Sequence, residues 1–255
     1  WLTGYFFPPI NHDVGAILDV SGRWVGGEKL YVDVIDENLP LTFVIHAAPV
    51  LIAKILPGGV PFWFTGLVVM GIAASFYACR RLIRLVPSAD HALTEGLLPP
   101  VLLFLFSVLP NEHFGQREHL MFVAAAPYLF ASMARAEGVS PRTGTAIAIG
   151  LVAGLGFAMK PYYLAIPAAV ELYLLVRRGW RTTFTDWIPW SIGAVAVAHL
   201  VSMYTIFSAF GNFVLPLAIE SYEPIGDQGW RQVLFGNVMA PTLLALLIFG
   251  AFAVF

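Results

Sequence analysis

The 255-residue chain is 58% hydrophobic and 12% charged, and its mean hydropathy is +0.77. Soluble domains are about 45 to 50% apolar and about 25% charged, so this composition excludes a soluble globular protein. Fourteen basic and sixteen acidic residues give a formal net charge of -2, which leaves no global field to recruit nucleic acid. Cys79 is the only cysteine, which excludes an internal disulfide and a thiolate-based structural zinc site.

The apolar segments predict an all-α polytopic membrane protein. A spanning helix needs roughly 20 mostly apolar residues, with about 17 as a practical minimum. We expect residues 1–9 to end a first span and residues 10–60 to form a large outer loop. Six spans are then predicted within residues 61–208, at 61–79, 93–110, 119–134, 143–159, 161–176 and 185–208.

The remaining segments complete this outline. Residues 41–57 are apolar but are expected to form a helix in the outer interface. Counting them as a span would place Arg80, Arg81 and Arg84 on the outer side of the membrane. Residues 209–238 are predicted to form an outer amphipathic loop, and residues 239–255 the start of a further span. Both ends of the chain look cut, so we interpret residues 1–255 as one transmembrane domain within a longer protein.

The loops differ in charge, which predicts their sidedness. Three short loops carry eight arginines, whereas the opposite set of loops is longer and acidic. The arginines are Arg80, Arg81, Arg84, Arg135, Arg142, Arg177, Arg178 and Arg181. Because basic loops stay in the cytoplasm, the acidic outer side is where we expect the chemistry.

The first outer loop holds six acidic residues directly after a membrane helix: Asp13, Asp19, Glu28, Asp33, Asp36 and Glu37. Such residues are costly near lipid unless they face water, a cation or a polar ligand. Composition alone favours a solvated loop. The order of the residues adds a second interpretation, because His12-Asp13 is followed by Gly27 and then by Tyr31-Val32-Asp33. The loop closes with Asn38-Leu39-Pro40-Leu41.

These motifs resemble the first periplasmic loop of the protein mannosyltransferase and lipid A aminoarabinose transferase group, within the GT-C superfamily. That group has an acidic pair, a Gly-x-x-x-Tyr-x-Asp step and an Asn-Pro-Pro-Leu-like helix start. This chain departs from it in two places, since the pair reads His12-Asp13 and Leu39 replaces the first proline. The resemblance implies a GT-C-like helical bundle whose large first periplasmic loop carries interfacial helices, with Asp13 as the catalytic base.

A second polar cluster follows the second complete span. It contains Glu112, His113, Gln116, Arg117 and Glu118. An arginine at this position in the family contacts the donor phosphate, and the planar guanidinium suits phosphate oxygens. The alternative for Arg117 is an interfacial side chain that extends to lipid headgroups or pairs with Glu118. Lys160 ends a later span on the same side, where it would either assist the leaving phosphate or extend to headgroups.

The resemblance implies a glycosyltransferase that moves a sugar from a polyprenyl-phosphate donor to a glycan, lipid or protein acceptor, on the periplasmic side of a bacterial inner membrane. His12, Tyr31, Glu112, His113, Gln116 and Glu118 are candidate substrate-binding residues. Asp33, Asp36 and Glu37 would orient the sugar or, as in metal-dependent relatives, hold a divalent cation; we predict no metal or other cofactor. Nucleic acid is not expected as a partner.

Two other functions remain open. The chain could be a non-catalytic subunit or scaffold of a larger membrane complex, or a transporter of a lipid-linked substrate. A transporter needs charged or broken helices near the bilayer midplane, and the predicted spans offer only Glu171 and His199. For both side chains we expect a bond to a neighbouring helix. Arg231, in the outer amphipathic loop, is a weaker candidate near the acceptor.

Overall fold

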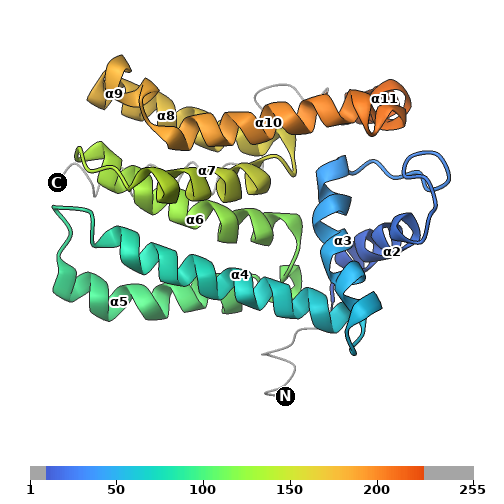
Figure 1. Cartoon of the computed structure of the whole chain (residues 1–255), viewed down its shortest axis with the longest axis horizontal. Coiled ribbons are helices and arrows are strands. Elements are labelled where there is room, and N and C mark those ends of the chain that lie inside the picture. Colours follow the sequence, from blue (N-terminus) through green and yellow to red (C-terminus); the bar gives the residue numbers. More distant parts are fainter. Residues whose placement is uncertain (1–9, 227–255) are drawn as a thin grey trace.

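The structure, a computed structural model, describes residues 10–226, and every regular element in that range is helical (Figure 1). This confirms the predicted all-α class. The elements are α2 (His12–Val25), α3 (Pro40–Ile55), α4 (Val60–Ile83), α5 (His91–Leu103), η1 (Phe104–Val108), η2 (Asn111–His113), α6 (Arg117–Ala136), α7 (Thr143–Phe157), η3 (Pro161–Leu164), α8 (Ala165–Arg178), α9 (Trp180–Phe184), α10 (Trp187–Thr205), η4 (Phe210–Val214) and α11 (Leu215–Gly226). The predicted spans at 1–9 and 239–255, and Arg231, lie outside the described residues.

Long antiparallel helices form the body of the molecule. The helix α7 packs between α6 and α10, α6 also packs on α4, and α5 lies beside α4 (Figure 1). Each predicted span between 61 and 208 corresponds to one helical stretch in this bundle. Among the described residues, α4 and α10 are long and apolar enough to cross a membrane. With 15 and 14 residues, α7 and α8 are shorter.

Glycines on α7 allow its close contact with α10. A Cβ atom at Gly150 would lie 2.6 Å from the Ile188 carbonyl oxygen, and one at Gly154 would lie 3.0 Å from Val195 Cβ. The two glycines are four residues apart and therefore face the same side of the helix. Small residues at this spacing bring the backbones of membrane helices together. The pair explains why α7 and α10 share the most extensive helix contact in the bundle.

The end of the bundle where α6 stops is held by a buried ionic network. Arg135 is fully buried, and its Nη1 donates to Glu171 Oε1 at 2.7 Å while its Nε donates to Asp186 Oδ2 at 2.5 Å. Asp186 also caps α10 by accepting from Ile188 N. The network ties α6, α8 and α10 together. Glu171 thus bonds a neighbouring helix as predicted. The same prediction is wrong for His199, whose buried Nε2 atom has no hydrogen-bond partner among the described residues. Arg135 lies inside the bundle rather than in a loop.

A second layer of helices covers the opposite end of the bundle. The helices α2 and α3 pack on each other, and α3 also packs on α4 (Figure 1). The helix at the predicted outer interface, residues 41–57, therefore exists as α3. It begins at Pro40, whose fixed φ suits the first helical turn. The connection between α2 and α3 is anchored by Tyr31, which is buried among aromatic rings that include Phe43 and Phe210.

The Gly150 contact predicts a loss of stability on substitution. We expect Gly150→Leu to lower the free energy of unfolding by about 2 kcal/mol, because overpacking of this kind costs about 1 to 3 kcal/mol. Gly144→Leu is the matched control on the same helix, since a Cβ atom at Gly144 meets nothing within 4 Å. Thermal unfolding of the detergent-solubilised protein measures both variants. Equal stability of the two would contradict the close packing of α7 and α10.

The ionic network predicts that replacing two arginines at the same end of the bundle lowers stability by different amounts. Arg135→Met removes the arginine that Glu171 pairs with and leaves Asp186 with only the longer contact to Arg178 Nη1, at 3.5 Å. Breaking a buried pair in this way costs about 3 to 5 kcal/mol. Arg84 is also paired, with Glu95 at 2.8 Å, but about half of each side chain is exposed. Arg84→Met should therefore cost less than about 1 kcal/mol. Denaturant titration of both variants tests this difference, and similar losses would argue against the network.

Candidate functional site

Two segments about a hundred residues apart in sequence meet at the end of the bundle covered by α2. Asn11 Nδ2 donates to the Glu112 carbonyl oxygen at 3.0 Å. Gln116 Nε2 donates to Asp13 Oδ2 at 3.4 Å. The start of the first outer loop and the turn before α6 therefore lie side by side, and the structure brings together Asp13, Glu112 and Gln116 from the two predicted clusters.

Asp13 lies in the first turn of α2, where its carboxylate is about half exposed. The N-cap of this helix is Asn11, whose side chain accepts from the Asp13 backbone N–H. A negative charge at a helix N-terminus is stabilised by the helix dipole. His12 Nε2 lies 2.9 Å from Asp13 Oδ1. The carboxylate is thus held at one edge by an imidazole and at the other by an amide, and it remains open to solvent.

Gln116 connects two predicted substrate-binding residues. His113 Nδ1 donates to Gln116 Oε1 at 3.0 Å, and the amide nitrogen of the same side chain faces Asp13. His113 also lies 3.8 Å from Glu112. The polar groups of the turn thus form a connected chain from Glu112 to the Asp13 carboxylate. A hydroxyl-rich ligand at this place would meet both donors and acceptors.

The turn between η1 and α6 is held firmly from two sides. His119 is buried; it accepts from Gly115 N at 2.9 Å and donates from Nε2 to the Phe106 carbonyl oxygen at 2.8 Å. Gly115 has a φ of +79° and packs against Phe64, so a Cβ atom there would lie 2.6 Å from the ring. The Phe64 ring also stacks with His46, at a centroid distance of 5.4 Å. These contacts fix the backbone that carries Gln116 and Arg117.

Arg117 is the first residue of α6 and is partly buried. It has no hydrogen bond or ion pair with another residue in the part of the chain that the structure describes. A partly buried guanidinium without a partner, at the N-terminus of a 20-residue helix, favours an anion nearby. Burial lowers the pKa of His46 to about 4, and the positive charge of Arg117 contributes to this shift.

Lys160 is already neutralised. Its ammonium pairs with Glu118 and lies over the rings of Tyr162 and Tyr163, 5.6 Å and 5.8 Å from their centroids. Burial tends to raise the pKa of Glu118, but the hydrogen bond and charge of Lys160, with further hydrogen bonds, lower it below its ordinary value. One alternative from the sequence paired Glu118 with Arg117, whereas the structure pairs it with Lys160.

The remaining predicted site residues lie at the other end of α2. The Tyr31 hydroxyl donates to the Asn38 carbonyl oxygen at 2.5 Å, and burial raises the pKa of this side chain. Asp33 accepts from Lys29 N, and Asp36 accepts from Asn38 N. These bonds shape the connection between α2 and α3, and Glu37 is exposed beside them. The structure does not bring these four residues to the Asp13 cluster. Within the described residues, no three His, Cys, Asp or Glu side chains gather as a metal site.

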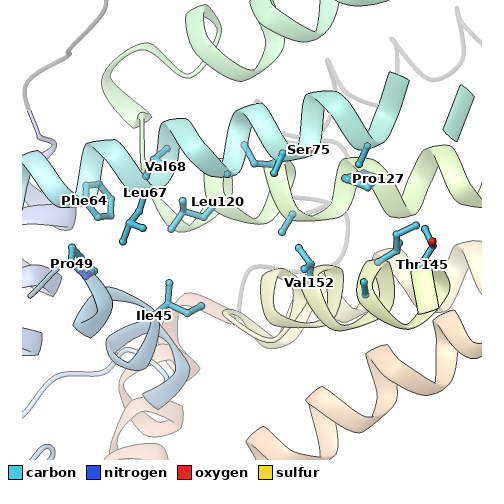
Figure 2. Close-up of a pocket in the computed structure, with 17 residues that line it drawn as sticks. Ile45, Pro49, Phe64, Leu67, Val68, Ser75, Leu120, Pro127, Thr145 and Val152 are labelled. Atoms are coloured by element: carbon cyan, nitrogen blue, oxygen red, sulfur yellow. The ribbon is translucent and has the colours of Figure 1, made fainter. Parts of the chain in front are cut away.

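An apolar groove that was not predicted from the sequence begins at Leu120 on α6, three residues after Arg117. Its volume is about 570 Å³, and it lies between α3, α4, α6 and α7 (Figure 2). Leu120, Ala124 and Pro127 line it from α6, on the helix face that Arg117 begins. A sequence signal for the groove did exist. Small residues recur on α4 at 71, 74, 75 and 78, which is the spacing of one helix face and leaves room beside it.

Comparison of the chain with protein-family models, with curated proteins and with solved structures finds no match.

The buried His46 predicts a dependence of stability on pH. His46 donates from Nδ1 to the Thr42 carbonyl oxygen at 2.7 Å, and it stays neutral in the folded protein because its pKa is about 4 instead of 6.5. Below pH 6.5 the unfolded chain binds a proton that the folded chain does not, so stability falls as the pH falls. Between pH 7 and pH 5 the loss should be about 2 kcal/mol.

His46→Leu should remove this part of the pH dependence. Unfolding of the parent and the variant is measured at pH 7 and pH 5 in the same detergent, and the difference between the two slopes isolates His46. Identical slopes would contradict the neutral, buried state of this imidazole.

Proposed function

We propose that the chain is a multi-pass membrane protein whose bundle faces lipid. In the most apolar windows of α4 and α10 only 28% and 22% of the residues are buried inside the structure. Large apolar side chains such as Met70 and Val197 are more than half exposed on these helices. Exposed apolar surface of this extent needs a membrane or a partner to cover it. The helices that are shorter than a full span would cross with the help of interfacial residues at their ends.

The charges support an orientation for the bundle. The arginines of the three basic loops lie where α4, α6 and α8 end, and the candidate site lies at the opposite end, where α6 begins (Figure 1). By the positive-inside rule the arginine-rich end is cytoplasmic. The candidate site then opens on the outer side, which in a bacterial inner membrane is the periplasm.

The function that this site supports best is transfer of a sugar from a polyprenyl-phosphate donor. One observation carries the proposal. Arg117, which has no partner within residues 10–226, stands at the start of the helix face whose Leu120, Ala124 and Pro127 line the apolar groove. A ligand with an anionic head and an apolar chain complements this arrangement. The head would receive two hydrogen bonds from the guanidinium fork and further donors at the helix N-terminus. The prenyl chain would lie in the groove (Figure 2).

The polar cluster provides the groups that such a transfer requires. Asp13 takes the proton from an acceptor hydroxyl as the hydroxyl oxygen attacks the anomeric carbon of the donor sugar. The bond between that carbon and the phosphate oxygen breaks, and the negative charge that develops on the departing prenyl phosphate is stabilised by Arg117. His12 and Gln116 orient the Asp13 carboxylate, while Glu112 and His113 contact the hydroxyl groups of the donor sugar. Lys160 assists indirectly, since its charge is shared with Glu118.

Separate effects on binding and on transfer test this proposal. The full-length protein in lipid nanodiscs is assayed for binding of a prenyl phosphate and for release of sugar from the corresponding prenyl-phosphate sugar. Arg117→Gln should weaken prenyl phosphate binding about tenfold or more, because it removes a charge-assisted pair. Asp13→Asn should keep binding but reduce sugar transfer by about a hundredfold or more.

Arg81→Gln is the control for loss of one arginine, since Arg81 lies at the other end of α4 and contacts Tyr77. Its binding and transfer should match those of the parent protein. The proposal fails if Arg81→Gln and Arg117→Gln have equal effects, or if Asp13→Asn keeps near-normal turnover. Copurification with stoichiometric partners and no turnover would instead favour a non-catalytic subunit.

A further inference from the structure

A second cavity lies along α2, next to the candidate base. Its volume is about 650 Å³, and it is bounded by α2, α3 and the start of α4. Asn11 lines it, and its ionisable side chains are His12, Asp19 and Arg23. These residues are seven and four positions apart, so they occupy one face of the helix. Asp19 and Arg23 have no part in the transfer proposed above.

The polar groups of this cavity are available to a ligand to different degrees. Asp19 is exposed and forms no hydrogen bond or ion pair with another described residue, although it feels the charge of Arg23. Arg23 holds Glu28 through Nε and Nη2. His12 lies at the end of the cavity nearest the site, where its ring touches the Asp13 carboxylate. One end of the cavity is therefore formed by a side chain that contacts Asp13, the proposed base.

We propose that this cavity, the α2 groove, binds one pyranose ring of a glycan acceptor. The role of the bound sugar as acceptor rests on the glycosyl transfer proposed above. The ring's apolar face packs on Val60 and Pro61 at the start of α4. The Asp19 carboxylate accepts hydrogen bonds from two neighbouring hydroxyl groups. A hydroxyl at the His12 end then lies next to Asp13 and becomes the nucleophile.

Glycines give the α2 groove its depth and provide a way to close it. Gly15 and Gly22 line the groove, and a Cβ atom at either position meets nothing within 4 Å. A larger side chain at Gly22 can therefore extend into the groove without a clash in the protein. Gly96 on α5 has the same open surroundings but lies on another helix. Gly96→Leu is therefore a matched control for a glycine-to-leucine change outside the groove.

Saturation-transfer NMR on the full-length protein in nanodiscs tests the proposal. The probes are the methyl glycosides of glucose, galactose and mannose, with a short peptide rich in serine and threonine as the competing class of acceptor. We expect binding of at least one glycoside and none of the peptide. Gly22→Leu should abolish that binding, and Asp19→Asn should weaken it about tenfold, the effect of losing one charge-assisted hydrogen bond. Gly96→Leu should bind as the parent does.

Several outcomes would overturn the proposal: no glycoside bound by the parent, glycoside binding that survives both Gly22→Leu and Asp19→Asn, equal loss in Gly96→Leu, or binding of the peptide alone. Binding of prenyl phosphate, measured on the same samples, should be unchanged in Gly22→Leu. If the parent binds a glycoside but no prenyl phosphate, the donor proposed above is wrong while the saccharide site stands.

Discussion

Hydrogen bonds between the start of α2 and the turn before α6 hold the candidate site together. Asn11 bonds the backbone at Glu112, and Gln116 reaches the Asp13 carboxylate. Each of these contacts depends on a rigid turn, and the turn is rigid because His119 bonds the backbone on both sides of it. If the turn were free, Asp13 and Arg117 would belong to two independently moving layers. The roles that we propose for Asp13 and Arg117 therefore depend on the backbone that holds them in place.

The arginines at the two ends of α6 differ in how their charges are satisfied. Arg135 is fully buried, and two carboxylates compensate its charge. Such a network stabilises the position of helices but leaves nothing for a ligand. Arg117 is partly buried without a partner among the described residues, while its neighbour Lys160 is paired with Glu118. The contrast gives one end of the bundle a structural role and supports the ligand binding that we propose at the other.

The approximate limits of the helices between residues 61 and 208 could be predicted because apolar segments are separated by charged loops. Among the described helices, however, α4 and α10 alone are long and apolar enough to cross a membrane. The turn holding Glu112, Gln116 and Arg117 was expected on the same side as Asp13, and hydrogen bonds bring this turn and the start of α2 together. Tyr31, Asp33 and Asp36 were grouped with Asp13 by their order in one loop, but that loop contains α2. Its 14 residues separate the ends by about 20 Å. The apolar groove and the burial of Arg135 depend on which helix faces meet, which a single sequence does not determine.

The central claim is that one amphipathic ligand lies with its head at Arg117 and its chain in the groove between α4, α6 and α7. The most direct measurement uses a prenyl phosphate that carries a photoreactive diazirine in its chain. After irradiation in nanodiscs, mass spectrometry identifies the labelled peptides. We expect labelling of the groove around Leu120 and Ala124, suppressed by excess unlabelled prenyl phosphate. Labelling confined to the lipid-facing surface of α10, or not reduced by competition, would contradict the account.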